Sequence, residues 1–331
     1  MKSLIRSLCG LLEDGESFVL ATVVESSGST PRSSGAKMAV RADGSILGTV
    51  GGGLVEAEAC RDARALLDGE EEDGVARLSF VDMTSELAAN SDMICGGGLT
   101  VLLEVVEPGG PCALALSKVD SLMRRGVHSA LNTRIQGNGD DMRAVNHVIT
   151  TGPQESRTPS FLRDEEGMRL AEPMIPPAPL FIFGAGHVSL FTAKVGAMVG
   201  FRTVVLDDRD DFANRDRFPE ADDVVVLENF KDCFAGQDVG EDAFIVIVTR
   251  GHLHDRTVLA QALRTPAGYV GMIGSKSKRD KIYESLLADG YTQADIDRCH
   301  CPIGLTIGAQ TPEEIAVSIA AELIQERSGG K

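Results

Sequence analysis

The C-terminal half of the chain alternates short apolar runs with stretches of helical spacing, and this alternation restricts the possible folds more than any other feature. The apolar runs predict buried strands at 180–183, 203–207, 224–227, 244–248 and 269–273. Helices are expected between them at 187–199, 254–264 and 277–289. Continuous Val and Ile runs separated by helices are typical of a parallel sheet covered on both faces. We therefore expect an α/β, doubly wound parallel sheet in residues 180–331.

A glycine turn follows the first of these strands. The segment Gly184-Ala185-Gly186-His187-Val188-Ser189 resembles the dinucleotide fingerprint, in which glycines permit a tight turn and let a pyrophosphate approach a helix N-terminus. Asp207 ends the second strand, where an acidic side chain accepts hydrogen bonds from ribose hydroxyls. These features predict a Rossmann-like domain and make NAD a candidate cofactor. Ser189 replaces the third glycine, so a protein that has kept the fold and lost the dinucleotide is the alternative.

Two further loops follow strands of the same sheet, at the edge where α/β sheets bind ligands. Arg250 and His252 in the first loop are candidates for holding an anion or moving a proton, whereas Asp255 is explained most simply as a helix cap. The second loop, Gly274-Ser275-Lys276, opens a helix and combines a glycine turn with a hydroxyl and a cation. Such a helix start is a predicted anion site.

The first half of the chain has a less regular pattern. Strands are expected at 18–24, 38–41, 99–106 and 143–150, and helices at 54–67 and 112–124. Four prolines between Pro173 and Pro179 exclude a helix or a central strand there. We therefore expect an N-terminal α+β domain at 1–172, a proline-rich linker at 173–179 and the Rossmann-like domain at 180–331.

Three glycine-rich loops in the first half are candidate binding sites. The loop at 26–37 carries many hydroxyl groups and the cations Arg32 and Lys37. The run Gly51-Gly52-Gly53 precedes a predicted helix with Glu56 in its first turn, so backbone N–H groups there are able to approach an anion. The third loop begins at Cys95-Gly96-Gly97. Its thiol is either a reactive thiolate or soft metal ligand, or a buried inert cysteine, and the residues alone leave both open.

Charge and cysteine usage exclude several classes of function. The chain has 331 residues and a net charge of −17, which argues against the broad basic surface that nucleic acids or anionic membranes require. No apolar run approaches the roughly 18 residues of a transmembrane helix, and no signal-peptide pattern is found at the start. The seven cysteines are scattered, which is typical of a protein of the reducing cytoplasm.

Eight motifs occur in a fixed order along nearly the whole chain. They are GSTPRSSGAKMAV (28–40), GTVGGGLVEAEA (48–59), CGGG (95–98), FGAGHVS (183–189), DDRDDFANRDRFPEAD (207–222), VTRGHLHD (248–255), GMIGSKSKRDK (271–281) and PIGLTIGAQTPEEIAVSIAAELI (302–324). In this combination the chain resembles the XdhC/CoxI family, accessory proteins for the maturation of xanthine dehydrogenase and related molybdenum hydroxylases. Only about 108–175 lacks a sharp motif.

The resemblance implies a cofactor chaperone rather than a stand-alone enzyme. Members of the family are understood to bind the molybdenum cofactor, in a mono- or dinucleotide form, and to protect it during sulfuration by a cysteine desulfurase. They then deliver it to the apo-hydroxylase. The resemblance also implies a homodimer. It favours a functional Cys95, because a thiol suits a nearby molybdenum atom.

The expected site combines reactive side chains with a larger set of cofactor-binding residues. The reactive side chains are Cys95, Glu56 and His252. The cofactor-binding set is Arg32, Lys37, Gly51, Gly52, Gly53, Gly96, Gly97, Gly184, Gly186, His187, Asp207, Arg250, Gly274, Ser275 and Lys276. We expect their loops to converge in a cleft between the two domains. The alternatives are an NAD(H)-binding oxidoreductase and a nucleotide-sensing regulatory protein, both based on the glycine turn and Asp207.

Overall fold

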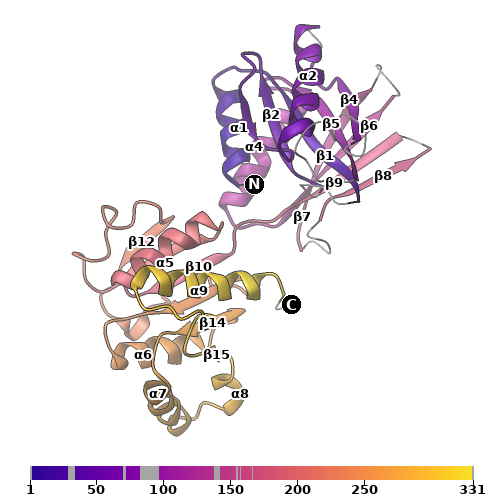
Figure 1. Ribbon diagram of the computed structural model, residues 1–331. Coiled ribbons are helices and arrows are strands. Elements are labelled where there is room, and N and C mark those ends of the chain that lie inside the picture. Colours follow the sequence, from indigo (N-terminus) through magenta and orange to yellow (C-terminus); the bar gives the residue numbers. More distant parts are fainter. Residues whose placement is uncertain are drawn as a thin grey trace. The chain divides into compact units, whose positions relative to one another are not determined.

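The chain folds into two compact units, Met1–Pro176 and Pro177–Lys331 (Figure 1). The computed structural model describes residues 2–28, 34–69, 72–82, 97–137, 142–153, 156, 158–165 and 167–329. Within these ranges no helix combines the length and the apolar character needed to cross a membrane.

Two antiparallel sheets form the first unit. The first sheet has the order β3-β2-β1-β5-β4 and contains β1 (Phe18–Gly28), β2 (Lys37–Arg41), β3 (Ile46–Gly48), β4 (Ala76–Asp82) and β5 (Gly97–Val106). The second sheet has the order β7-β6-β9-β8 and contains β6 (Ser129–Gln136), β7 (Arg143–Thr151), β8 (Ser160–Asp164) and β9 (Gly167–Met174). The N-terminal antiparallel sheets confirm the expected α+β character of this half.

Both faces of the first sheet are buried. Alternate β1 residues such as Val19 and Ala21 pack against the buried side of α2 (Gly53–Asp68). The intervening residues face the second sheet, α1 (Lys2–Glu13) and α4 (Pro111–Arg124). Because a strand buried on both faces has no polar alternation, β1 reads as a nearly continuous apolar run.

Two of the prolines between Pro173 and Pro179 belong to strands: Pro173 lies within β9, and Pro179 is the first residue of β10 (Pro179–Phe183). β9 continues through Pro173, which pairs with Ala130 of β6. On its other side β9 is paired only as far as Ala171, opposite Ser160 of β8. Pro173 therefore lies where β9 is locally an edge strand, a position at which the missing N–H is tolerated.

The second unit is the doubly wound parallel sheet that the sequence predicts. Its strand order is β12-β11-β10-β13-β14-β15, from β10 (Pro179–Phe183), β11 (Arg202–Asp207), β12 (Asp223–Val226), β13 (Phe244–Ile247), β14 (Tyr269–Met272) and β15 (Cys299–His300). All neighbouring pairs are parallel. The chain direction across the sheet reverses between β10 and β13, so ligands are expected to bind at the carboxyl ends of these two strands.

Helices cover both faces of this parallel sheet. One face packs against α5 (His187–Met198) and α9 (Pro312–Arg327), which lie side by side in Figure 1. The other face packs against α6 (His252–Ala262) and α7 (Lys276–Ala288), and the short α8 (Gln293–Ile296) follows. The two helical layers complete a Rossmann-like fold.

The last helix is only partly buried. Residues such as Ile319 and Leu323 are buried against the sheet, but Val317 is 51% exposed and Ile324 is 40% exposed. α9 packs against α5, and Val317 and Ile324 leave apolar surface exposed on α9. Its start has a capping box, in which Thr311 and Glu314 bond each other's backbone N–H groups.

Candidate functional site

The glycine turn after β10 requires glycine at its first position for steric reasons. Gly184 has φ +108°, and a Cβ atom at this position would lie 2.5 Å from the carbonyl oxygen of Val248, next to the end of β13. Gly186 is the N-cap of α5, and among the described residues no side-chain cap bonds the N–H groups of the first turn. His187 is exposed at this helix start. The turn therefore presents uncapped N–H groups at the reversal point of the sheet, as an anion site requires.

Asp207 occupies a position different from the one expected for a ribose ligand. Its side chain is 1% exposed, and its carboxylate accepts a hydrogen bond from the Ala185 N–H at 2.8 Å. Arg209 adds a bidentate contact, with Nε at 2.8 Å and Nη2 at 2.9 Å. Asp207 thus holds the glycine turn against the end of β11, and its oxygens are already engaged within the chain.

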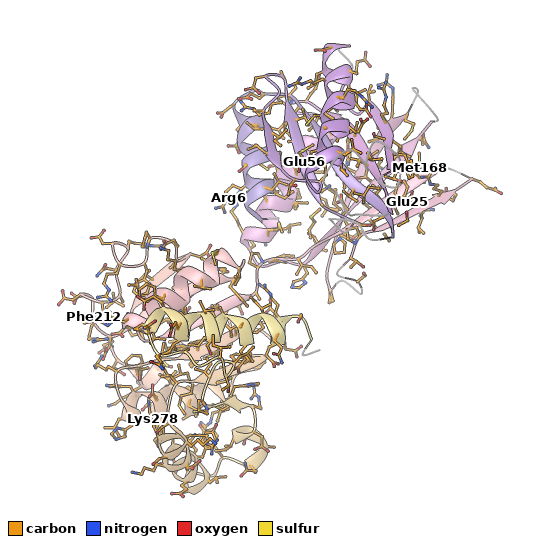
Figure 2. The ribbon with its side chains drawn as sticks, in the orientation of Figure 1. Arg6, Glu25, Glu56, Met168, Phe212 and Lys278 are labelled. Carbon is orange, nitrogen blue, oxygen red and sulfur yellow. The ribbon has the colours of Figure 1, made fainter. Side chains whose placement is uncertain are left out.

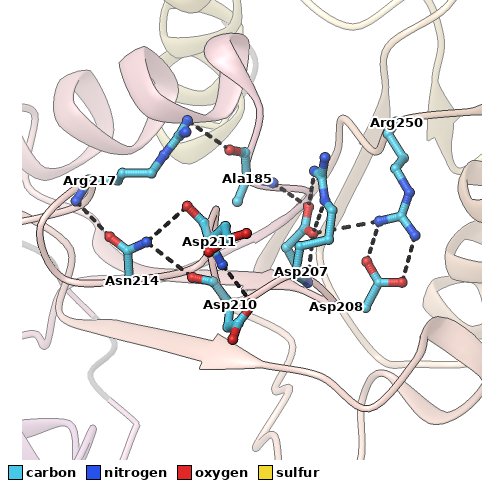
Figure 3. Close-up of polar contacts among 9 residues, drawn as sticks. Ala185, Asp207, Asp208, Asp210, Asp211, Asn214, Arg217 and Arg250 are labelled. Atoms are coloured by element: carbon cyan, nitrogen blue, oxygen red, sulfur yellow. Dashed lines mark hydrogen bonds and ion pairs between the residues drawn. The ribbon is translucent and has the colours of Figure 1, made fainter.

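Arg250 is paired with the carboxylate next to Asp207. Its guanidinium donates two hydrogen bonds to Asp208, one of them from Nη2 to Oδ2 at 2.8 Å (Figure 3). Arg250 is 38% exposed, whereas Asp208 is 15% exposed. The hydrogen bond from Arg250 lowers the pKa of Asp208 below its ordinary value. The pair ties the loops after β11 and β13 together, and an anion would have to share or displace Arg250.

The loop after β11 adds two stacked arginines. The guanidinium groups of Arg209 and Arg217 lie 3.8 Å and 4.7 Å from the ring centroid of Phe212. Arg217 also donates a hydrogen bond to the Ala185 carbonyl at 3.2 Å (Figure 3). The loop at 207–217 therefore contacts the glycine turn on both its N–H and its carbonyl side.

The predicted cap Asp255 has another role. α6 begins earlier than expected, at His252, and its N-cap is Gly251. The fully buried Asp255 accepts hydrogen bonds from Thr249, with Oγ1 at 2.6 Å, and forms an ion pair with Lys278 of α7. His252 is exposed. Asp255 consequently fixes the loop after β13 to α7.

A basic pocket lies between α6 and α7. Its volume is about 580 Å³, and its lining residues are His252, Leu253, Arg256, Ser275, Ser277, Lys278, Lys281, Ile282 and Ser285. The Ser275 hydroxyl accepts a hydrogen bond from the Lys278 N–H and so caps α7. Lys276 is exposed at the same helix start, after Gly274. Of the predicted anion loop at 274–276, Ser275 is among the lining residues of this pocket, which the label of Lys278 marks in Figure 2.

Glu56 in the first unit organises its glycine loop. It lies in the first turn of α2 (Figure 2), where its Oε1 accepts hydrogen bonds from the Thr49 hydroxyl and from the Gly52 N–H at 3.0 Å. Gly51, Gly52 and Gly53 all have positive φ, which explains the choice of glycine. The carboxylate that we expected to be reactive thus satisfies the N–H groups of its own loop.

Lys37 is buried away from any solvent-exposed ligand position. It is 5% exposed, forms an ion pair with Glu172 at 2.8 Å and donates a hydrogen bond to Thr22 at 2.8 Å. Both partners belong to the two packed sheets of the first unit. The structure therefore gives Lys37 an internal ion pair in place of the expected contact with a cofactor.

Two of the glycine motifs meet at one end of the first sheet. Gly28 of β1 pairs with Gly97 of β5, and the Ser27 hydroxyl exchanges hydrogen bonds with the backbone of Gly98. A Cβ atom on Gly98 would lie 2.9 Å from the ring of Phe80. The predicted residues Arg32, Cys95 and Gly96 lie outside the described residues.

A depression of about 500 Å³ lies beside this pairing. Its lining residues are Val24, Glu25, Ser26, Ser27, Ser34, Phe80, Gly98 and Thr100, and Glu25 marks it in Figure 2. Hydroxyl groups dominate its polar side, and the Phe80 ring is 67% exposed. The depression combines hydrogen-bonding groups with one flat apolar surface.

Family models match both halves of the chain. The model described as the XdhC Rossmann domain matches residues 180–323, and the model described as the XdhC and CoxI family matches residues 11–79. The chain belongs to the XdhC/CoxI family. This membership confirms the resemblance carried by the eight motifs.

Similar proteins span nearly the whole chain. The uncharacterized protein YqeB of Escherichia coli K12 is 28% identical over 94% of this chain, which spans only 44% of YqeB. A protein of Bacillus subtilis 168 that is named as a probable subunit of xanthine dehydrogenase is 29% identical, over 97% of this chain and 96% of that protein. The molybdenum cofactor insertion chaperone PaoD of Escherichia coli K12 is 24% identical, over 98% and 88%. A crystal structure described as a xanthine dehydrogenase from Bacillus halodurans aligns with a TM-score of 0.80 and 27% identity, over 98% and 96%.

Several pocket-lining residues of this XdhC/CoxI chain could not be predicted from the sequence. Phe80 and Thr100 line the first depression, and Arg256 lines the basic pocket. One sequence feature could have drawn attention to Phe80: aromatic residues are scarce and make up only 5% of this chain. Thr100 and Arg256 carried none, because a polar residue on a strand or helix is usually a solvated one.

Proposed function

We propose that this chain is a molybdenum-cofactor insertion chaperone for a molybdenum hydroxylase of the xanthine dehydrogenase type. The observation that carries the proposal is the pairing of Gly28 with Gly97 beside the 500 Å³ depression. Because Gly28 and Gly97 are paired, the segment that contains Arg32 and the segment that contains Cys95 both connect to the same end of the first sheet. PaoD, the relative named as an insertion chaperone, supports the same role.

The depression has the chemistry that a phosphorylated pterin dithiolene needs as cargo. Its volume lies within the roughly 300–1,000 Å³ of small-molecule sites. The hydroxyls of Ser26, Ser34 and Thr100 donate to ring nitrogens, carbonyls or phosphate oxygens, and the exposed Phe80 ring offers a face for stacking. Cys95 precedes Gly97 by two residues and would supply a thiolate to the molybdenum.

The basic pocket of the second unit suits the phosphates of a nucleotide. Lys281 lines it beside the start of α7, together with Arg256 and Lys278, which are paired with Asp289 and Asp255. A nucleotide phosphate would meet these cations and a helix N-terminus together, and would share Arg256 and Lys278 with their carboxylates. This pocket favours a separate nucleotide that regulates delivery. NAD bound in the expected manner is disfavoured, because the oxygens of Asp207 are engaged by Ala185 and Arg209.

A cysteine desulfurase is the second partner that we propose. The cargo would be sulfurated while this chain holds it, because a bound cofactor is shielded from water and oxygen until delivery. The acidic net charge of −17 leaves an outer surface suited to protein partners with basic patches.

The test is the identity of the ligand that the protein retains. The full chain is purified from cells with an active molybdenum-cofactor pathway, and released ligands are identified by mass spectrometry, which separates mono- from dinucleotide forms. We expect a molybdopterin species in the wild type and its loss in Cys95→Ala. The control is Cys60→Ala, which removes a half-buried free thiol on α2 of the same unit.

A second variant separates ligand loss from misfolding. Thr100→Val keeps side-chain shape and removes one lining hydroxyl, so retention should fall while the melting temperature stays unchanged. Wild-type protein without any pterin, or equal retention in Cys95→Ala and Cys60→Ala, would contradict the proposal. Transfer is then measured as the activation of an apo-hydroxylase by the loaded protein.

A further inference from the structure

A group of buried polar residues lies between the two sheets of the first unit, apart from both candidate pockets. Glu104 comes from β5 of the first sheet, His147 from β7 of the second sheet and Cys112 from the first turn of α4. Their potential ligand atoms all lie within 4.8 Å of one another. Three different elements thus direct one oxygen, one nitrogen and one sulfur donor to a common point.

The three side chains are almost completely shielded from water. The Glu104 and His147 side chains are 5% and 2% exposed, and Cys112 is 2% exposed. Apolar clusters lie on both sides of the group, with Leu20 in one and Leu102 in the other. Buried polar groups of this kind require partners that satisfy them.

Glu104 is incompletely satisfied by the side chains around it. Its Oε1 lies 2.8 Å from His147 Nε2, but this contact is not aligned as a hydrogen bond, and Oε1 accepts no other among the described residues. The nearby cation Lys37 is matched by Glu172 at 2.8 Å. A cation bound between Glu104 and His147 would therefore balance the negative charge of the Glu104 carboxylate.

The other ring nitrogen of His147 is already held. Nδ1 lies 3.1 Å from the hydroxyl of Thr133 on the neighbouring strand β6. Ligating histidines usually have their second nitrogen fixed in this way, which sets the tautomer and the ring orientation. Nε2 is consequently the free ligand atom, and it is the one that faces Glu104.

We propose that Glu104, Cys112 and His147 form a binding site for one divalent cation of the zinc type. A thiolate, an imidazole and a carboxylate suit Zn²⁺, with a fourth position left for water or another donor. Tetrahedral bond lengths place such ligand atoms about 3.5 Å apart. The widest present separation, at most 4.8 Å, would have to close by up to about 1.3 Å, and the 2.8 Å contact between Glu104 and His147 would have to open by about 0.7 Å. The Cys112 proton passes to solvent on binding, and the ion joins both sheets and α4.

The test uses Co²⁺ as a spectroscopic probe in the full-length, metal-stripped protein. We expect one equivalent of Co²⁺ to produce a thiolate-to-cobalt charge-transfer band that Zn²⁺ abolishes by displacement. The band should disappear in Cys112→Ser and persist in Cys95→Ser and Cys60→Ser. This pattern separates the site from the thiol of the proposed cargo site, so either proposal is able to fail alone.

Two further measurements keep the test decisive if Cys112→Ser does not fold. His147→Gln should weaken Co²⁺ binding at least tenfold, and Zn²⁺ should raise the melting temperature of the wild type but not that of His147→Gln. A band that persists in Cys112→Ser, or the absence of a thiolate band at one bound Co²⁺ per chain, would overturn the proposal.

Discussion

The carboxylate of Asp207 accepts a hydrogen bond from the N–H of Ala185 at 2.8 Å. This bond joins the end of β11 to the glycine turn after β10, and Arg209 completes the coordination of the same carboxylate. In a dinucleotide-binding domain an acidic residue at this place would be turned toward a ribose. Here it stabilises the turn itself, so the geometry of the α5 start depends on a charge that solvent does not reach.

Asp207→Asn should therefore destabilise the second unit. A side-chain amide cannot accept the hydrogen bond from the Ala185 N–H and also balance the positive charge of Arg209. The variant should therefore lose about 2 kcal/mol in the free energy of unfolding. The control is Asp210→Asn, because Asp210 is exposed in the same loop and should tolerate the change. Calorimetry of the two variants measures the effect, and equal melting temperatures would show that the buried contacts contribute little.

An added methyl group should destabilise the protein strongly at Gly184 and hardly at all at Gly186. Gly184→Ala combines φ +108° with a Cβ atom 2.5 Å from the Val248 carbonyl, and should cost about 3 kcal/mol or more. Gly186 has φ −77° and no atom within 4 Å of a built Cβ, so Gly186→Ala should stay within about 0.5 kcal/mol. Circular dichroism melts compare them, and a stable Gly184→Ala would contradict the close approach of the two loops.

The Lys37–Glu172 pair should show strong coupling between its members. Lys37→Met leaves a carboxylate that is 3% exposed without its cation, which should destabilise the first unit by about 3–5 kcal/mol. The double variant Lys37→Met/Glu172→Leu removes both charges and should recover most of that loss. A double-mutant cycle in denaturant measures the coupling, and purely additive effects would argue against a buried pair.

The pKa of Asp208 should depend on its hydrogen bonds with Arg250. The hydrogen bond from Arg250 holds the pKa of Asp208 below its ordinary value of 3.8, so the stabilisation is complete above that pH. It is lost as the pH falls through the lower folded-state pKa. Arg250→Gln should raise the pKa of Asp208, as measured by NMR of the carboxyl carbon. Arg215→Gln, which removes an exposed arginine from the same unit, should leave it unchanged.

His300 should show the opposite pH dependence. Its hydrogen bond to Glu322, with Nδ1 and Oε1 3.0 Å apart, raises the pKa of His300 above 6.5. The stabilisation is therefore complete below pH 6.5 and lost as the pH rises through the higher folded-state pKa. Glu322→Gln should lower the pKa of His300 in NMR titrations. Glu326→Gln should have a smaller effect, because Glu326 acts only through space, and equal shifts would exclude the hydrogen bond as the cause.

Local patterns predicted the second unit well because its strands are buried on both faces. The runs at 180–183 and 244–248 could be recognised without knowing their neighbours, and they match β10 and β13 within a residue at each end. β8 could not be found in this way. Its side chains are mostly exposed, so its strand character comes from pairing with β9 rather than from composition.

The sequence predicted which residue types occur at the candidate site, but it did not predict the role of each residue. Glycines at 51–53 and 184 could be expected at turns, because only glycine adopts their backbone conformations freely. Lys37, Glu56 and Asp207 were expected to meet a ligand, but each finds a partner within the chain. Their partners Glu172, Thr49 and Ala185 are brought there by strand register and turn geometry, which composition does not reveal.

The buried contact between Lys37 and Glu172 also constrains the order of events on the ribosome. The two residues are 135 positions apart, so at about 5–20 residues per second Lys37 is synthesised on the order of ten seconds before its carboxylate exists. During that interval the lysine of β2 lacks the carboxylate with which it pairs in the folded interior. The first unit is thus able to close only after β9 has emerged, which places its completion late in translation of that unit.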